Sequence, residues 1–174
     1  MIDSYVPGPT FPGLPLLDPI LRDVTFAALL VVVVIALVRL ARRRTAFGPS
    51  ALVAVLLWLA AAAWLTMEPG DAGRINLVPF SFGSDASLFE PVSNVLLFVP
   101  LGLLLRSFGW RLLAVVGTGL AVSLIIEVTQ YLVNMGRTAD INDLVENTIG
   151  TLLGSLVAVL LGRMANGRHT TALR

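Results

Sequence analysis

Two series of polar residues interrupt apolar stretches of this chain, and their spacing places each series on one face of a helix. The first series steps by four, four, three and four residues through Gly119, Ser123, Glu127, Gln130 and Asn134. The second steps by three, four, three and four through Asp140, Asp143, Asn147, Gly150 and Gly154. Residues three or four apart share a helix face, so we expect two polar stripes on two neighbouring helices. If the stripes face each other or a common cavity, Glu127 and Gln130 would meet Asp143 and Asn147.

Glu127 is the strongest candidate for chemistry, because it lies within an apolar run. A charged side chain there costs roughly 2.5–3.5 kcal/mol at the centre of a membrane helix, and such residues are functional candidates by default. We expect a site that binds a lipid-linked or lipid-tailed ligand, with Arg137 suited to pair with a phosphate or carboxylate. Its lining residues would be Asn76, Asn94, Glu127, Gln130, Arg137, Asp140, Asp143 and Asn147.

An enzyme is the alternative, with the catalytic residue unassigned and Glu127 as its candidate. Glu127, Asp140 and Asp143 could hold Mg²⁺ or Mn²⁺, which prefer oxygen ligands, or Glu127 could act as a general base. The chain lacks a Walker loop and an HExxH motif, and its one histidine, His169, lies in a predicted tail. The sequence requires no cofactor. A structural subunit or a small transporter is the third reading.

Structural roles compete with these readings at most of the same positions. Asp140 and Asp143 imitate a helix capping box, and interhelical hydrogen bonds involving polar side chains also hold membrane bundles together. Gly150 and Gly154 form a GxxxG spacing, which lets two helices approach closely. Asn94 is also a plausible cap or turn residue.

The composition is that of a membrane protein. Of the 174 residues, 56% are hydrophobic and 13% are charged, whereas soluble domains average about 25% charged residues. There is no cysteine, which excludes disulfides and thiolate sites. The basic residues are arginines at the ends of apolar runs, without interleaved aromatic residues, and this pattern excludes a nucleic-acid surface.

Five apolar stretches predict an all-α, polytopic membrane bundle. The candidate spans are 24–41, 50–67, 92–105, 112–133 and 144–161. The third stretch is short, so a re-entrant segment with four full spans is the alternative. Residues 1–22 lack the basic region and apolar core of a signal peptide, and we expect the first span to direct insertion.

The arginines orient this bundle. Nine of the twelve follow the first, third and fifth spans, whereas three lie on the other side. The positive-inside rule then predicts an external N-terminus and a cytoplasmic C-terminus. The expected organisation is an extracytoplasmic segment at 1–22, a transmembrane bundle at 23–162 and a cytoplasmic tail at 163–174.

Several of these segments together resemble the VanZ-like family of bacterial integral membrane proteins. The matching segments are NLVPF (76–80), NVLLFVPLG (94–102), EVTQ (127–130) and RTADIND (137–143), followed by Asn147 and Gly150. The resemblance covers about residues 64–162. It implies a multi-pass protein of the bacterial plasma membrane with a role in the cell envelope. The founding member is associated with low-level resistance to teicoplanin, a lipid-tailed glycopeptide antibiotic.

The expected partners follow from these readings. They are the lipid bilayer, a lipid-linked envelope precursor or a lipoglycopeptide, and a second copy of the chain in a homodimer.

Overall fold

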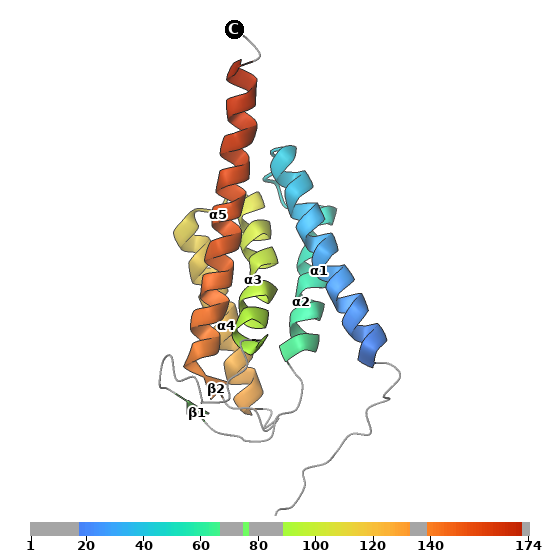
Figure 1. The fold of residues 1–174 in the computed structure, drawn as a ribbon, viewed down its shortest axis with the longest axis vertical. Helices are drawn as coiled ribbons and strands as arrows, with labels where there is room; N and C mark the ends of the chain where they lie inside the picture. The colour runs from blue at the N-terminus through green and yellow to red at the C-terminus, as the bar shows by residue number, and fades with distance from the viewer. Residues whose placement is uncertain (1–17, 67–74, 77–88, 133–138, 172–174) are drawn as a thin grey trace, which may run out of the picture.

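The computed structural model describes residues 18–66, 75–76, 89–132 and 139–171. Within these ranges the chain forms five helices: α1 (Asp18–Ala41), α2 (Pro49–Thr66), α3 (Phe89–Ser107), α4 (Leu112–Leu132) and α5 (Ile141–Thr171). Two short strands, β1 (Ile75–Asn76) and β2 (Ala139–Asp140), make one parallel pair. Figure 1 shows the helices side by side and alternating in direction along the chain. The predicted all-helical architecture is confirmed.

Four of the described helices are long and apolar enough to cross a membrane. Their apolar segments are Ile20–Ala41, Pro49–Thr66, Leu112–Leu132 and Ile141–Met164. Large apolar side chains such as Leu30, Leu113 and Ile125 lie exposed on the outside of the bundle. In water such a surface would promote association, whereas lipid chains solvate it. The chain is therefore a multi-pass membrane protein.

The helices extend beyond the spans predicted for α1, α3 and α5. Helix α1 begins at Asp18 rather than Val24, and α5 begins at Ile141 and continues to Thr171. Hydropathy marks the part of a helix that crosses hydrocarbon, and a helix can continue past that boundary into the polar interface. The predicted span positions are thus right, and the helix ends lie further out.

Helix α3 has a shorter apolar segment than the four spans above and lies at the centre of the bundle. Its 19 residues continue through Pro100 as one helix, with a length of about 28 Å at 1.5 Å per residue. It runs in the same direction as α1 and α5 (Figure 1). No re-entrant hairpin interrupts residues 89–107. The apolar part of this helix, Pro91–Ser107, is shorter than the four spans above, so a full crossing by the third segment stays a prediction beside the re-entrant alternative.

The other four helices surround α3, so its side chains are buried on several sides. These buried residues are Leu97, Phe98, Leu101, Leu103, Leu104 and Leu105. Trp58 of α2 packs edge-on against Phe98, with the ring centroids 5.3 Å apart. Its indole Nε1 donates a hydrogen bond of 2.9 Å to the Leu97 carbonyl. The one polar atom of this buried ring is thus satisfied inside the bundle.

Glycines bring the backbones of α3 and α5 into direct contact. A Cβ atom at Gly150 would overlap the Val95 carbonyl oxygen, and one at Gly154 would overlap that of Val99. From the other side, a Cβ atom at Gly102 would overlap the Thr151 carbonyl oxygen. The predicted packing role of Gly150 and Gly154 is confirmed. These contacts set the register between α3 and α5, which carry most of the polar residues described below.

Candidate functional site at the acidic end

Charged side chains separate to the two ends of the bundle. At one end α1, α3 and α5 begin and α2 and α4 finish (Figure 1). We call this the acidic end; the acids of the described segments here are Asp18, Asp23, Glu90, Glu127, Asp140, Asp143 and Glu146, and one arginine, Arg22, accompanies them. We call the opposite end the arginine end; the arginines of the described segments here are Arg39, Arg42, Arg43, Arg44, Arg106, Arg111, Arg163 and Arg168.

Asn94 joins two carboxylates of α5 at the acidic end. Its Nδ2 atom donates to Asp143 Oδ1 at 2.8 Å and to Glu146 Oε2 at 2.9 Å. An amide nitrogen carries two hydrogens, so both are used by these bonds. Asp143 and Glu146 are three residues apart and therefore project from the same face of α5. All three side chains are partly exposed, so the cluster reaches the surface of the bundle.

Glu127 lies deeper, on α4, with 5% of its surface exposed. Its Oε2 atom accepts a hydrogen bond of 3.1 Å from the backbone N–H of Asp140. The Asp140 side chain in turn caps α5, because its Oδ1 atom accepts from the backbone N–H of Asn142 at 2.8 Å. A second bond of 2.9 Å comes from Asn142 Nδ2.

The predicted capping role of Asp140 is confirmed, but the arrangement differs from a capping box. In a capping box the residue three positions later accepts from the backbone N–H of the cap residue. Here Glu127, from the preceding helix, accepts from that N–H. Asp143, the residue in the capping-box position, accepts from Asn94. The start of α5 is thus tied to both α4 and α3.

Asn76 joins this region through its backbone. It lies opposite Asp140 in the parallel pairing of β1 and β2, and Ile75 lies opposite Ala139. The backbone of Asn76 therefore lies next to the residue whose N–H contacts Glu127. The side chain of Asn76 lies outside the described part of the structure.

Gln130 contacts a helix that the stripe pattern did not predict. Its Nε2 atom donates to the Thr66 carbonyl at the end of α2, and its side chain is buried. The last carbonyls of a helix lack partners within the helix, and this bond satisfies one of them. Gln130 therefore holds α2 against α4.

Asn147 contacts α4 one helical turn away from the predicted position. Its Nδ2 atom donates to Ser123 Oγ at 2.9 Å, and both side chains are buried. Its Oδ1 atom is buried without a hydrogen-bond partner among the described residues. The expected meeting of the two stripes is confirmed, but the pairs are Ser123 with Asn147 and Glu127 with Asp140.

Two predicted features of the site have different outcomes. Arg137 lies outside the described residues, so its role stays a prediction. Glu127, Asp140 and Asp143 are all described, and the described residues contain no group of three acidic, histidine or cysteine side chains placed to hold a metal ion. The metal reading of Glu127, Asp140 and Asp143 therefore gains no support from the described residues and stays a prediction. Physically, Glu127 and Asp143 accept from nitrogen donors on different helices.

Residues that the sequence analysis did not place in the site also take part. Glu146 shares the Asn94 amide with Asp143, Ser123 contacts Asn147, and the Thr66 carbonyl receives Gln130. The three-residue step from Asp143 to Glu146 was a usable signal for the first. The sequence carried no signal for Thr66, because only its backbone carbonyl contributes to the contact.

Comparison with known proteins points to one family. The profile described as VanZ/LLP1 matches residues 24–162. The protein named "Protein VanZ" from Enterococcus faecium is 36% identical over 84 residues, which are 46% of this chain and 49% of that protein. The chain thus spans about half the length of this curated relative. No solved structure matches the chain.

Proposed function

The chain belongs to the VanZ/LLP1 family of bacterial multi-pass membrane proteins, and from this premise we propose that its acidic end binds the polar part of a lipid-linked or lipid-tailed envelope ligand. Binding there lowers susceptibility to lipid-tailed glycopeptides such as teicoplanin. The observation that carries the proposal is the Asn94 amide shared by Asp143 and Glu146 at a partly exposed position.

The chemistry of this cluster selects the ligand class. Carboxylates accept hydrogen bonds from amine, amide and hydroxyl groups, and peptide and sugar portions of envelope molecules are rich in these donors. Asp143 and Glu146 lie on one helix face, where two like charges favour a cationic or multiply donating ligand group. The lipid tail of such a ligand would remain beside the apolar exterior of the helices.

The arginine distribution supports an external position for the acidic end. The described arginines are concentrated at the opposite end, which the positive-inside rule places in the cytoplasm. An envelope ligand in the outer leaflet would then meet Asn94, Asp143 and Glu146 directly. Glu127 would contribute indirectly, because it accepts the hydrogen bond from Asp140 that holds the start of α5 in place.

Teicoplanin susceptibility of a bacterial host tests the proposal. The host expresses the wild type, Glu127→Gln, Glu146→Gln, the control Asp23→Asn or an empty vector, at matched levels in the membrane. Asp23 is an exposed acid of α1 at the same end, so its variant makes a similar change in charge. We expect protection by the wild type and Asp23→Asn, and reduced protection by the other two. Equal susceptibility with wild type and vector contradicts the resistance role. Protection retained by Glu127→Gln and Glu146→Gln contradicts the site.

A further inference from the structure

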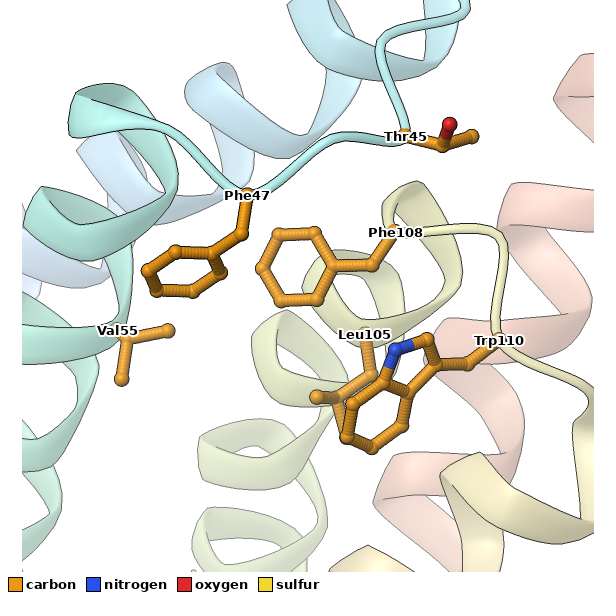
Figure 2. Close-up of a pocket in the computed structure, with 6 residues that line it drawn as sticks. All are labelled: Thr45, Phe47, Val55, Leu105, Phe108 and Trp110. Carbon is orange, nitrogen blue, oxygen red and sulfur yellow. The ribbon is translucent and has the colours of Figure 1, made fainter.

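An apolar pocket of about 310 Å³ lies at the arginine end, opposite the candidate site. Its lining residues are Thr45, Phe47, Val55, Leu105, Phe108 and Trp110. They come from the connection between α1 and α2, from α2, and from the end of α3 with the turn that follows (Figure 2). The volume is at the lower end of the range for ligand pockets, which suits a narrow apolar group.

Three aromatic rings form one side of this pocket. Phe47 and Phe108 are in edge contact, with centroids 5.7 Å apart, and Phe108 and Trp110 are 6.4 Å apart. Phe47 is 64% exposed and Trp110 is 42% exposed. Exposed aromatic rings at the ends of membrane helices typically lie at the level of the lipid headgroups. The pocket is therefore accessible where an acyl chain joins its headgroup.

Arginines adjoin the pocket-lining residues in the sequence. Arg44 directly precedes Thr45, and Arg111 directly follows Trp110. The Arg106 guanidinium donates to the Trp110 carbonyl from the last turn of α3. The sequence contains no acid at 24–67, 91–126 or 147–174, which covers every segment at this end. These segments therefore supply no acidic side chain that could pair with the arginines.

A buried arginine fixes the geometry of the pocket. Arg39 is 3% exposed, and its guanidinium lies 5.0 Å from the centre of the Phe108 ring. It donates to the Ala46 carbonyl at 2.8 Å, and also to the hydroxyls of Ser50 and Ser107 at 3.4 Å. These bonds hold the α1–α2 connection against the end of α3. The pocket is thus built into the fold by a positioning residue.

We propose that this pocket binds an anionic glycerophospholipid of the leaflet at the arginine end. One acyl chain lies against Phe47, Phe108 and Trp110, and the phosphate lies at Arg44 and Arg111. The apolar lining favours a lipid over a soluble anion, and the acid-free arginine rim favours an anionic headgroup over a zwitterionic one. This lipid site is separate from the proposed function, which concerns the opposite end.

Trp110 provides a native fluorescent reporter for the test. In a Trp64→Phe background, the remaining tryptophans are Trp110 and the buried Trp58. The protein is reconstituted in phosphatidylcholine vesicles that contain a fixed fraction of either dibrominated phosphatidylglycerol or dibrominated phosphatidylcholine. Bromine quenches indole fluorescence at contact. We expect stronger quenching by the anionic lipid, and no loss of it when inorganic phosphate is added in excess.

Two sets of variants test the headgroup and the acyl chain separately. Arg44→Gln and Arg111→Gln should each lower the preference for the anionic lipid by about fivefold, whereas Arg163→Gln, an exposed arginine of the same end, should preserve it. Val55→Phe fills the pocket and should reduce quenching by both lipids. Val53→Phe, an exposed position on the same helix, should leave quenching unchanged.

Three outcomes would overturn the proposal. Equal quenching of the wild type by both lipids would exclude headgroup selection. An equal effect of Arg163→Gln and Arg44→Gln would mean that surface charge alone attracts the lipid. Loss of the preference in excess phosphate would identify a site for a soluble anion. Circular dichroism of each variant confirms that it remains folded.

Discussion

The backbone N–H of Asp140 donates to the Glu127 carboxylate across the boundary between α5 and α4, at 3.1 Å. This bond places an acid from the membrane-crossing part of α4 at the first turn of α5. The positive end of a helix favours a negative charge, so Glu127 adds an electrostatic contribution to the side-chain cap that Asp140 supplies. The acid thus has a structural partner as well as a proposed role in binding.

Glu127→Gln and Glu127→Ala should differ in their effect on thermal stability. The Gln side chain retains an oxygen that can accept from Asp140, whereas Ala leaves that N–H without this acceptor. We expect Ala to cost about 1–3 kcal/mol of unfolding free energy and Gln to cost less. Thermal unfolding in detergent, followed by circular dichroism, measures both. Equal losses would mean that the bond to Asp140 contributes nothing specific.

Gly154→Ala and Gly162→Ala should change stability in opposite directions. Both lie on α5, but a Cβ atom at Gly154 meets the Val99 carbonyl, whereas nothing lies within 4 Å of one at Gly162. Forced separation of α3 and α5 should cost about 1–3 kcal/mol, and Gly162→Ala should gain up to about 1 kcal/mol of helix propensity. Melting temperatures of the two variants give the comparison. A stable Gly154→Ala variant would contradict the backbone contact.

Ser123 and Asn147 should be energetically coupled. Ser123→Ala leaves the Asn147 amide without its acceptor, and Asn147→Leu removes the amide altogether. A double-mutant cycle should give a coupling of about 0.6 kcal/mol, the average measured for interhelical hydrogen bonds in a membrane bundle, and no more than about 1.7 kcal/mol. Reversible unfolding of the four proteins supplies the cycle. If the losses of unfolding free energy in the two single variants add up to that of the double variant within about 0.3 kcal/mol, the hydrogen bond makes no net contribution to stability.

Arg39→Lys should destabilise the protein more than Arg42→Lys. The Arg39 guanidinium reaches three acceptors and the Phe108 ring, and a lysine ammonium cannot reproduce this planar arrangement. Arg42, by contrast, is exposed. Thermal unfolding and the rate of limited proteolysis within the 42–48 connection should distinguish the variants, with the faster cleavage in Arg39→Lys. Similar behaviour of the two would show that Arg39 does not anchor this connection.

Single cysteines should label from opposite sides of the membrane. Leu132→Cys lies at the acidic end and Met164→Cys at the arginine end, both at exposed positions. The chain has no native cysteine, so there is no background. In intact cells, a membrane-impermeant maleimide should modify Leu132→Cys and should reach Met164→Cys only after permeabilisation. The reverse pattern would invert the orientation that we propose.

Spacing along the sequence predicts which side chains share a helix face, but not the height at which two helices meet. The spacing therefore predicts correctly which residues share a face of α4 and of α5. It does not predict the pairs that form between the helices, which are Ser123 with Asn147 and Glu127 with Asp140. The position of α5 along the bundle depends on its contacts with α3 at Gly150 and Gly154. Those contacts are between backbones and leave no periodic signal that identifies the partner carbonyls.

Arg39 illustrates a second limit of prediction. In the sequence it is one of several arginines after an apolar run, and it was interpreted only as a topology signal. The structure buries it, while Arg42, Arg43 and Arg44 are exposed. The difference arises because Arg39 lies on the last turn of α1 and faces α2 and α3, whereas the other three follow the helix. Helix packing, rather than residue type, decides this outcome.

The glycine contacts between α3 and α5 restrict how the protein can transmit motion. The backbones of these helices touch because Gly150 and Gly154 carry no side chain between them and the carbonyls of Val95 and Val99. Helices α3 and α5 are also the most extensively packed pair among the described helices. If a ligand at one end alters the other, we expect the displacement to fall on the less tightly packed α1 and α2, with α3 and α5 as the common frame.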